Sequence, residues 1–168
     1  MPIRARHLLL AAACLSAAAV SAPAAHAKPQ VCFATAIDQI LVADGKLTEQ
    51  DVDAGAAVDL VRCGDVTGDR VTDAVFTVAS GGTAGDIRFG VLQGGADPRI
   101  LLYEPAYKVG IARHDSRSFD TLQPHYGRHD ANCCPSSFRE QRFTWTGHRF
   151  TAGPVKKLAT APRRFYKP

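Results

Sequence analysis

The acidic loop formed by residues 65–73 constrains the fold of this chain more than any other feature. It reads Asp-Val-Thr-Gly-Asp-Arg-Val-Thr-Asp and places side-chain oxygens at its first, third, fifth and ninth positions. Apolar segments flank it, residues 58–61 before and residues 74–78 after. Two strand-like segments joined by a loop rich in Asp, Thr and Gly predict a β-hairpin with the acidic loop at its end.

The spacing of oxygen atoms in this loop is typical of a calcium site, because Ca²⁺ takes six to eight oxygen ligands from a tightly turned chain. The predicted ligands are the side chains of Asp65, Thr67, Asp69 and Asp73 and the backbone carbonyl of Val71. An EF-hand is excluded, since its twelfth position should be Glu and is Phe76 here. The alternative is a metal-free turn, in which the Asp and Thr side chains accept hydrogen bonds from nearby backbone N–H groups.

Residues 1–27 predict a signal peptide. Arg4 and Arg6 precede an apolar run over 8–20, and Ala25-His26-Ala27 offers small residues at the cleavage-determining positions. The run is shorter than the roughly 20 residues that a spanning helix needs. We therefore expect a secreted, periplasmic or envelope protein without a membrane span after cleavage. Lipidation at Cys14 is the alternative, although the Leu-small-small triplet that precedes a lipidated cysteine is missing there.

Four cysteines follow the signal peptide: Cys32, Cys63, Cys133 and Cys134. An even number in an exported chain predicts disulfides. A bridge between the adjacent Cys133 and Cys134 would compress the Cα separation that disulfides prefer. We therefore expect each of these two to pair with Cys32 or Cys63, in an order that the sequence leaves open. A thiol catalyst or zinc site is disfavoured, because no Cys-x-x-Cys pair is present.

The hydrophobic pattern predicts one small disulfide-bonded α+β domain over residues 28–155, with an N-terminal helix followed by a mainly antiparallel β-sheet. Apolar residues recur with a helical period over 31–41, until Asp44-Gly45. Thr48 and Asp51 resemble the cap of a second short helix. Further strands are expected over residues 87–92, 100–103, 109–113, 139–145 and 149–151. Residues 156–168 read as a loosely held basic tail.

Charge is divided unequally between the two halves of the mature chain. Residues 28–107 carry six Lys and Arg against twelve Asp and Glu, and residues 108–168 carry twelve against four. The net charges are therefore −6 and +8. Either the two halves attract each other within one fold, or the basic half faces an anion. No nucleic-acid-binding module is recognisable, so the expected partner is an anionic envelope component or an extracellular protein.

An enzyme would most readily use the histidines of the second half. A secreted metal-dependent hydrolase would draw on His114, His125, His129 and Asp130. However, Pro124 and Gly127 predict a loop around His125 and His129, and a loop does not align such a pair on one helix face.

Residues 63–78 resemble the calcium hairpin of the FG-GAP and VCBS repeat families. Those loops typically read Asp-x-Asn-Gly-Asp-Gly-x-x-Asp and lead directly into an apolar strand. This chain departs from the pattern at Arg70, where the families usually have Gly, and at Thr67, where Asn or Asp is commoner. The resemblance implies a structural calcium ion.

A second resemblance covers most of the mature chain. The acidic hairpin, the segment Arg-His-Asp-Ala-Asn-Cys-Cys-Pro over 128–135 and the aromatic residues of 143–145 are similar to the LppP/LprE family of exported actinobacterial lipoproteins. This resemblance implies an exported domain of unknown biochemical role. The resulting hypothesis is a non-catalytic, calcium-stabilised domain that binds a ligand or envelope component. The alternatives are the metal-dependent hydrolase and an inhibitor of an extracellular enzyme.

Overall fold

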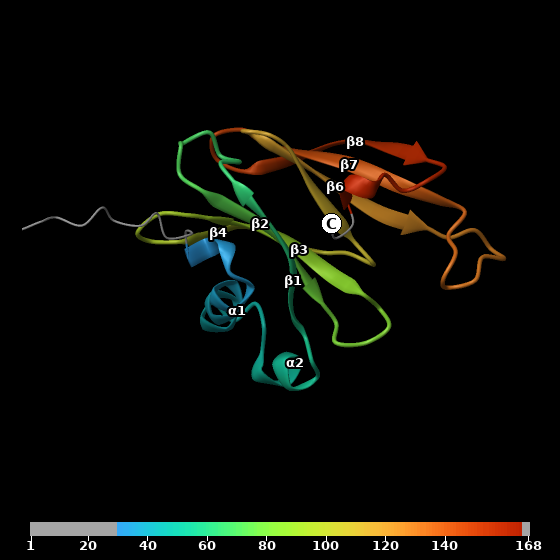
Figure 1. Cartoon of the computed structure of the whole chain (residues 1–168), viewed down its shortest axis with the longest axis horizontal. Helices are drawn as coiled ribbons and strands as arrows, with labels where there is room; N and C mark the ends of the chain where they lie inside the picture. The colour runs from blue at the N-terminus through green and yellow to red at the C-terminus, as the bar shows by residue number, and fades with distance from the viewer. Residues whose placement is uncertain (1–29, 166–168) are drawn as a thin grey trace, which may run out of the picture.

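A computed structural model describes residues 30–165 (Figure 1), and the predicted signal peptide lies outside this range. The described chain begins with the 3-10 helix η1 (Gln30–Cys32), followed by helices α1 (Ala34–Ala43) and α2 (Glu49–Asp53). The strands that follow are β1 (Ala57–Gly64), β2 (Asp73–Ala79), β3 (Asp86–Gln93), β4 (Arg99–Pro105), β5 (Gly110–Asp115), β6 (Ser118–His125), β7 (Ser137–Trp145) and β8 (Phe150–Leu158). A 3-10 helix, η2 (Arg163–Phe165), comes last.

The strands form two four-stranded sheets. Sheet A has the order β1-β2-β3-β4 and sheet B the order β5-β6-β7-β8. Every strand pairs in antiparallel fashion with the next along the chain. The predicted α+β fold with an N-terminal helix and antiparallel strands is confirmed. The division into two sheets is a feature that the hydrophobic pattern did not predict.

Sheet A lies between helix α1 and sheet B (Figure 1). Phe76 of β2 packs with Ile37 and Leu41 of α1, whereas its neighbour Val75 packs with residues of sheet B that include Phe119. Successive side chains of a strand point to opposite faces. The apolar run of β2 is therefore buried on both sides, which is why it reads as a continuous hydrophobic segment.

The helix ends that the sequence indicated are present. Helix α1 ends before Gly45, whose backbone is left-handed (φ 66°). At the start of α2, the Thr48 side chain accepts the Asp51 backbone N–H, and the Asp51 side chain accepts the Thr48 N–H in return. No helix within residues 30–165 is both long and apolar enough to cross a membrane.

Strand β6 is the element that the hydrophobic pattern missed. It is buried from Ser118 to Leu122, yet this stretch also contains Asp120 and Thr121. Polar residues do not normally mark a buried strand, so the stretch reads as loop. The predicted loop around His125 and His129 begins only after β6 ends at His125.

The face of sheet B that points away from sheet A, called the outer face below, is partly covered by the C-terminal segment. Phe165 of η2 packs with Ala112 and Leu122 and is only 1% exposed. The predicted tail of 156–168 is corrected accordingly, because β8 continues to Leu158 and residues 163–165 are held on sheet B. Burial of one aromatic ring contributes about 1.5–3 kcal/mol to holding this short segment in place.

The disulfide pairing also differs from the prediction. Cys32 of η1 pairs with Cys63 of β1, with a Cα–Cα distance of 5.8 Å, and Cys133 pairs with its neighbour Cys134. Cys32 and Cys63 both belong to the core between α1 and sheet A. The adjacent cysteines lie in the loop between β6 and β7, which belongs to sheet B. The division of the chain into two sheets therefore keeps the two pairs apart.

Candidate functional site

The acidic loop between β1 and β2 brings three predicted metal ligands together. One carboxylate oxygen from each of Asp65, Asp69 and Asp73 lies within 4.8 Å of the other two. Within residues 30–165, this is the single group of three or more His, Cys, Asp or Glu side chains with such geometry. The three carboxylates are therefore close enough to hold one metal ion between them.

Asp73 organises this loop from its buried end. It is fully buried, and one of its oxygens accepts hydrogen bonds from the backbone N–H groups of Val66 and Thr67, at 3.0 and 3.1 Å. The Thr67 hydroxyl donates to the same oxygen at 3.0 Å, and the N–H of Gly94 donates to the other at 3.0 Å. Thr67 thus lies beside Asp73 as a hydrogen-bond donor.

The other two carboxylates are likewise satisfied by the chain. Asp65 accepts the backbone N–H groups of Gly68 and Arg70. Asp69 accepts the N–H of Val71 at 2.8 Å and a side-chain amide from the end of β3 at 2.9 Å. The hydrogen bond from Val71 lowers the pKa of Asp69 below its ordinary value. These hydrogen bonds stabilise the turn, and an ion held by the three carboxylates would use their remaining lone pairs.

Arg70 occupies an unusual backbone conformation in this loop. Its φ is +69°, in the left-handed region that glycine adopts without steric cost. This is the position at which FG-GAP and VCBS loops usually carry Gly. Arg70 therefore holds a conformation that costs a non-glycine residue about 1–2 kcal/mol.

The histidines of the hydrolase hypothesis are distributed over separate parts of sheet B. His114 lies in β5, His125 ends β6, and His129 lies in the loop that follows. Asp130, next to His129, accepts hydrogen bonds from the backbone of Gly127 and from Ser136, and these bonds lower its pKa. Asp130 is therefore occupied in holding its own loop.

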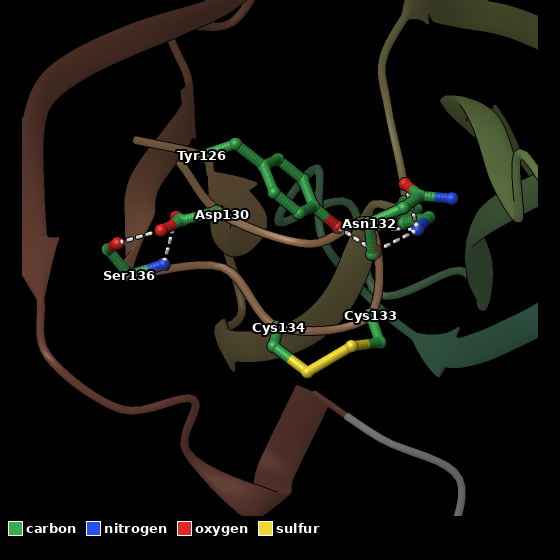
Figure 2. Close-up of a disulfide and its surroundings, with 7 residues drawn as sticks. Tyr126, Asp130, Asn132, Cys133, Cys134 and Ser136 are labelled. Atoms are coloured by element: carbon green, nitrogen blue, oxygen red, sulfur yellow. Dashed lines mark hydrogen bonds between the residues drawn. A yellow bond between two sulfur atoms is a disulfide. The ribbon is translucent and has the colours of Figure 1, made fainter. Parts of the chain in front are cut away.

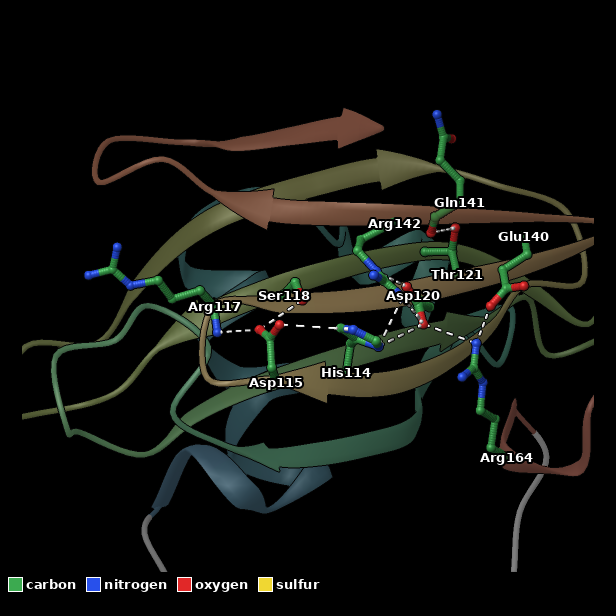
Figure 3. Close-up of polar contacts among 10 residues, drawn as sticks. All are labelled: His114, Asp115, Arg117, Ser118, Asp120, Thr121, Glu140, Gln141, Arg142 and Arg164. Atoms are coloured by element: carbon green, nitrogen blue, oxygen red, sulfur yellow. Dashed lines mark hydrogen bonds and ion pairs between the residues drawn. The ribbon is translucent and has the colours of Figure 1, made fainter. Parts of the chain in front are cut away.

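A buried carboxylate lies on the outer face of sheet B (Figure 3). The Asp120 side chain is 1% exposed and accepts hydrogen bonds from Arg142 of β7 at 2.9 Å and from Arg164 of η2 at 3.0 Å. Arg164 also pairs with Glu140. Burial of an ionised carboxylate requires such partners, so this network explains how β6 carries an Asp inside the fold and how η2 is attached to sheet B.

His114 takes part in the same network. Its Nδ1 lies 2.9 Å from Nη2 of Arg142 and 3.6 Å from Oδ2 of Asp120. The hydrogen bond to Asp120 raises the pKa of Arg142. His114 is therefore a member of a structural ion-pair network.

A hollow on the same face lies beside Phe165. It has a volume of about 260 Å³ and is called the Lys108 pocket below. Most of its lining is apolar, and the lining residues are Lys108, Gly110, Leu122, Pro124, Tyr126, Asn132, Cys133, Pro135, Phe138 and Phe165. Its size is close to the lower end of the range of about 300–1,000 Å³ for ligand sites, and such sites are also mainly apolar with few polar groups.

The Lys108 ammonium group is held in place by neutral groups. Its Nζ lies 2.8 Å from the carbonyl oxygen of Asn132, 2.9 Å from the Asn132 side-chain oxygen and 3.3 Å from the Tyr126 hydroxyl. The rings of Tyr107 and Tyr126 lie 5.3 and 5.6 Å away, within cation–π range. The hydrogen bond to Tyr126 raises the pKa of Lys108. No carboxylate within residues 30–165 forms a salt bridge with it.

The β6–β7 loop, drawn in Figure 2, contributes Asn132, Cys133 and Pro135 to the lining of this pocket. Residues 127–136, called the cysteine loop below, contain the Cys133–Cys134 disulfide. Cys133 lines the pocket, and the Asn132 carbonyl accepts hydrogen bonds from Lys108 and from the Tyr126 hydroxyl. The disulfide predicted to tie distant parts of the chain therefore shapes a single loop.

Apart from His114 and Cys133, the residues of the pocket and of the Asp120 network escaped sequence reasoning. Asp120 and Arg142 lie on neighbouring strands and are register partners, a relation that no linear motif displays. A carboxylate between strand-forming residues, with Phe119 and Thr121 on either side, is the one local signal that could have identified β6 and its buried ion pair.

These features define the chain as a small α+β domain of two antiparallel meanders with a pocket on its outer sheet. No protein-family model, curated protein or solved structure matches the chain.

Proposed function

We propose that this protein is an exported, non-catalytic domain that binds a small organic anion with an apolar body in the Lys108 pocket. The observation that carries the proposal is an ammonium group without a carboxylate partner, fixed at the edge of a mainly apolar hollow. Export is part of the proposal and rests on the signal-like residues 1–27 and on the two disulfides.

The pocket favours a ligand of mixed character. Leu122, Phe138 and Phe165 supply apolar surface that an acyl or aryl group would cover. The ammonium group of Lys108 already donates its hydrogen bonds to Asn132 and Tyr126. It would therefore attract a ligand by its positive charge. An anion bound beside Lys108 would neutralise a positive charge for which the pocket lining provides no carboxylate.

The pocket is also held in shape before any ligand arrives. Asp130 ties Gly127 to Ser136 across the base of the cysteine loop, and Asn132 ties the middle of the loop to Lys108. A preformed wall lowers the entropy lost on binding. This organisation supports ligand binding as the role of the loop.

The test is a fluorescence titration of the oxidised mature protein with anilinonaphthalene sulfonate, an aromatic anion, and with its uncharged relative phenylnaphthylamine. We expect one site per chain for both probes. Lys108→Met should weaken binding of the anion about tenfold more than binding of the uncharged probe, equivalent to about 1.4 kcal/mol, because loosening of the cysteine loop affects both probes and loss of the charge affects only the anion. Lys156→Met, which removes an exposed lysine from β8, is the matched control and should alter neither affinity.

Two results would contradict the proposal. One is the absence of saturable binding by either probe. The other is an equal loss of anion affinity in Lys108→Met and Lys156→Met, which would indicate attraction to the general positive charge of the second half.

We also propose that calcium stabilises the acidic loop, because the carboxylates of Asp65, Asp69 and Asp73 lie within 4.8 Å of one another. Ion binding would relieve the repulsion among three negative charges and fasten the β1–β2 hairpin. At a calcium concentration 100 times the Kd, the gain in unfolding free energy would be about 2.7 kcal/mol.

The calcium proposal is tested by thermal unfolding in EDTA and in excess calcium. We expect the Tm to rise with calcium in the parent protein and in Asp97→Ala, which removes an exposed carboxylate outside the cluster, and not in Asp69→Ala. A Tm that does not respond to calcium would assign the loop to the metal-free turn.

A further inference from the structure

The cysteine loop is held at three points, and two of them are polar. At its base, the Asp130 carboxylate accepts the backbone N–H groups of Gly127 and Ser136, at 2.7 and 2.6 Å. Further along, the Asn132 carbonyl accepts hydrogen bonds from Lys108 and from Tyr126, each at 2.8 Å. The third restraint is the covalent bond between Cys133 and Cys134, which directly follows Asn132 (Figure 2).

The two disulfides of the protein differ in access to solvent. Cys32 is 4% exposed and packs in the core beneath α1. Cys133 and Cys134 are both exposed. Thiol–disulfide exchange requires a thiolate to reach a disulfide sulfur, so its rate depends on access. A dithiol in solution therefore meets the Cys133–Cys134 bond first.

Opening this bond would change the pocket. Closure of the small ring between adjacent residues restricts the backbone of Cys133 and Cys134, and Cys133 is part of the pocket lining. Once the bond is broken, both residues regain backbone freedom. The Asn132 carbonyl helps to position Lys108, and the Cys133–Cys134 bond restrains the backbone next to it. Without this bond, the pocket wall would lose its preformed shape.

We propose that Cys133–Cys134 is a thiol–disulfide exchange site, and that its reduction by a protein or small-molecule dithiol lowers the affinity of the Lys108 pocket for its anionic ligand. The effect on affinity rests on the proposed function of that pocket. One thiolate of the dithiol attacks a sulfur of the pair, the Cys133–Cys134 bond breaks, and a mixed disulfide forms. The second thiol of the reagent then displaces the protein sulfur. Two electrons and two protons pass from the dithiol, which becomes a disulfide, to Cys133 and Cys134, which become thiols.

The experiment titrates the oxidised mature protein with dithiothreitol, alkylates free thiols and maps them by mass spectrometry. Anilinonaphthalene sulfonate binding is measured on the same samples. We expect alkylation of Cys133 and Cys134 at dithiol concentrations that leave Cys32–Cys63 intact. The Kd for the probe should rise about tenfold and return after reoxidation. A Cys133→Ser, Cys134→Ser double variant should have the weaker affinity of the reduced protein, with or without dithiol.

A readout independent of ligand binding separates this inference from the pocket function. Arg128 is an exposed trypsin site within the cysteine loop, and Arg149 is an exposed one in the β7–β8 turn. Reduction should accelerate cleavage at Arg128 and leave cleavage at Arg149 unchanged, because only the cysteine loop loses a restraint.

Three results would each contradict the exchange site, its control of the pocket or the pocket function. Reduction of Cys32–Cys63 before Cys133–Cys134 would overturn the exchange site. Full reduction of Cys133–Cys134 with unchanged probe affinity would overturn the control of the pocket. If the oxidised protein does not bind the probe at all, the pocket function fails, and the alkylation order and Arg128 cleavage then test the exchange site by themselves.

Discussion

Strands β2 and β6 hold equivalent places in the two sheets, since each is second in its meander and is the most buried strand of its sheet. Their chemistry differs. Between Ala74 and Val78, β2 is apolar except for Thr77. Between Ser118 and Leu122, three of the five residues of β6 are polar, and one of these is the buried Asp120.

The difference shows that burial in this protein is achieved in two ways. The core around β2 is stabilised by apolar contacts with α1 and with sheet B. On its outer side, β6 depends on two arginines that neutralise Asp120, and one of these, Arg164, arrives from the end of the described chain. Sheet A is therefore a scaffold with both faces covered, whereas sheet B has one partly covered face, which carries the Lys108 pocket.

The largest expected loss of stability comes from a substitution in the core around β2. Phe76 is fully buried between α1 and sheet A, so Phe76→Ala should lower the free energy of unfolding by about 3–5 kcal/mol through the cavity that it leaves. Urea denaturation measures the loss. Val155→Ala, at a side chain of β8 that is 54% exposed, should change it by less than about 0.5 kcal/mol. A loss below about 1 kcal/mol for Phe76→Ala would show that β2 is not the centre of the core.

Removal of the two disulfides should lower the free energy of unfolding by different amounts. Cys32 and Cys63 are 31 residues apart in sequence, so replacing both by Ala should cost about 3–4 kcal/mol in the chain-entropy account. Replacing Cys133 and Cys134 by Ser should cost less than about 1 kcal/mol, because a bond between neighbours closes no long loop. Calorimetry of the two double variants compares them. Equal losses would show that the cysteine loop contributes to the global fold.

A smaller loss is expected from the ion pairs of β6. Asp120→Asn keeps the shape of the side chain but removes the charge that Arg142 and Arg164 share. The cost should be about 1–3 kcal/mol, limited because both arginines are nearly half exposed and can turn to water. Asp115→Asn is the control on β5, at a side chain that is 57% exposed. If the two variants are equally stable in urea, the Asp120 network does not hold β6.

The smallest effect concerns the pH dependence of the cysteine loop. Hydrogen bonds from Ser136 and Gly127 lower the pKa of Asp130. Its contribution is therefore complete above the unfolded pKa of about 3.9 and is lost as the pH falls through the lower folded pKa. The protection factors of the Gly127 and Ser136 amides, which compare each exchange rate with the unprotected rate at the same pH, should stay high down to about pH 4 and fall below it.

Asp130→Asn is the control for this pH dependence, because it should remove the acid transition. Loss of protection near pH 6 in the parent protein would contradict the assignment of the transition to Asp130.

Local chemistry was sufficient to predict several elements of the fold. The Thr48–Asp51 cap, the end of α1 before Gly45 and the hairpin around the acidic loop each depend on residues close in sequence. The clustering of Asp65, Asp69 and Asp73 follows from the same tight loop. Such features are determined by the sequence alone, because their hydrogen bonds join neighbours along the chain.

The tertiary structure decided the rest, since it depends on residues that meet only after the sheets form. The division into two sheets brought Cys32 to Cys63 and left Cys133 with Cys134. Strand β6 is buried because Arg142, 22 residues away, and Arg164, 44 residues away, neutralise Asp120. The Lys108 pocket likewise combines β5, β6, the cysteine loop and η2. Contacts at such separations leave no periodic pattern, so composition and spacing along the chain could not reveal them.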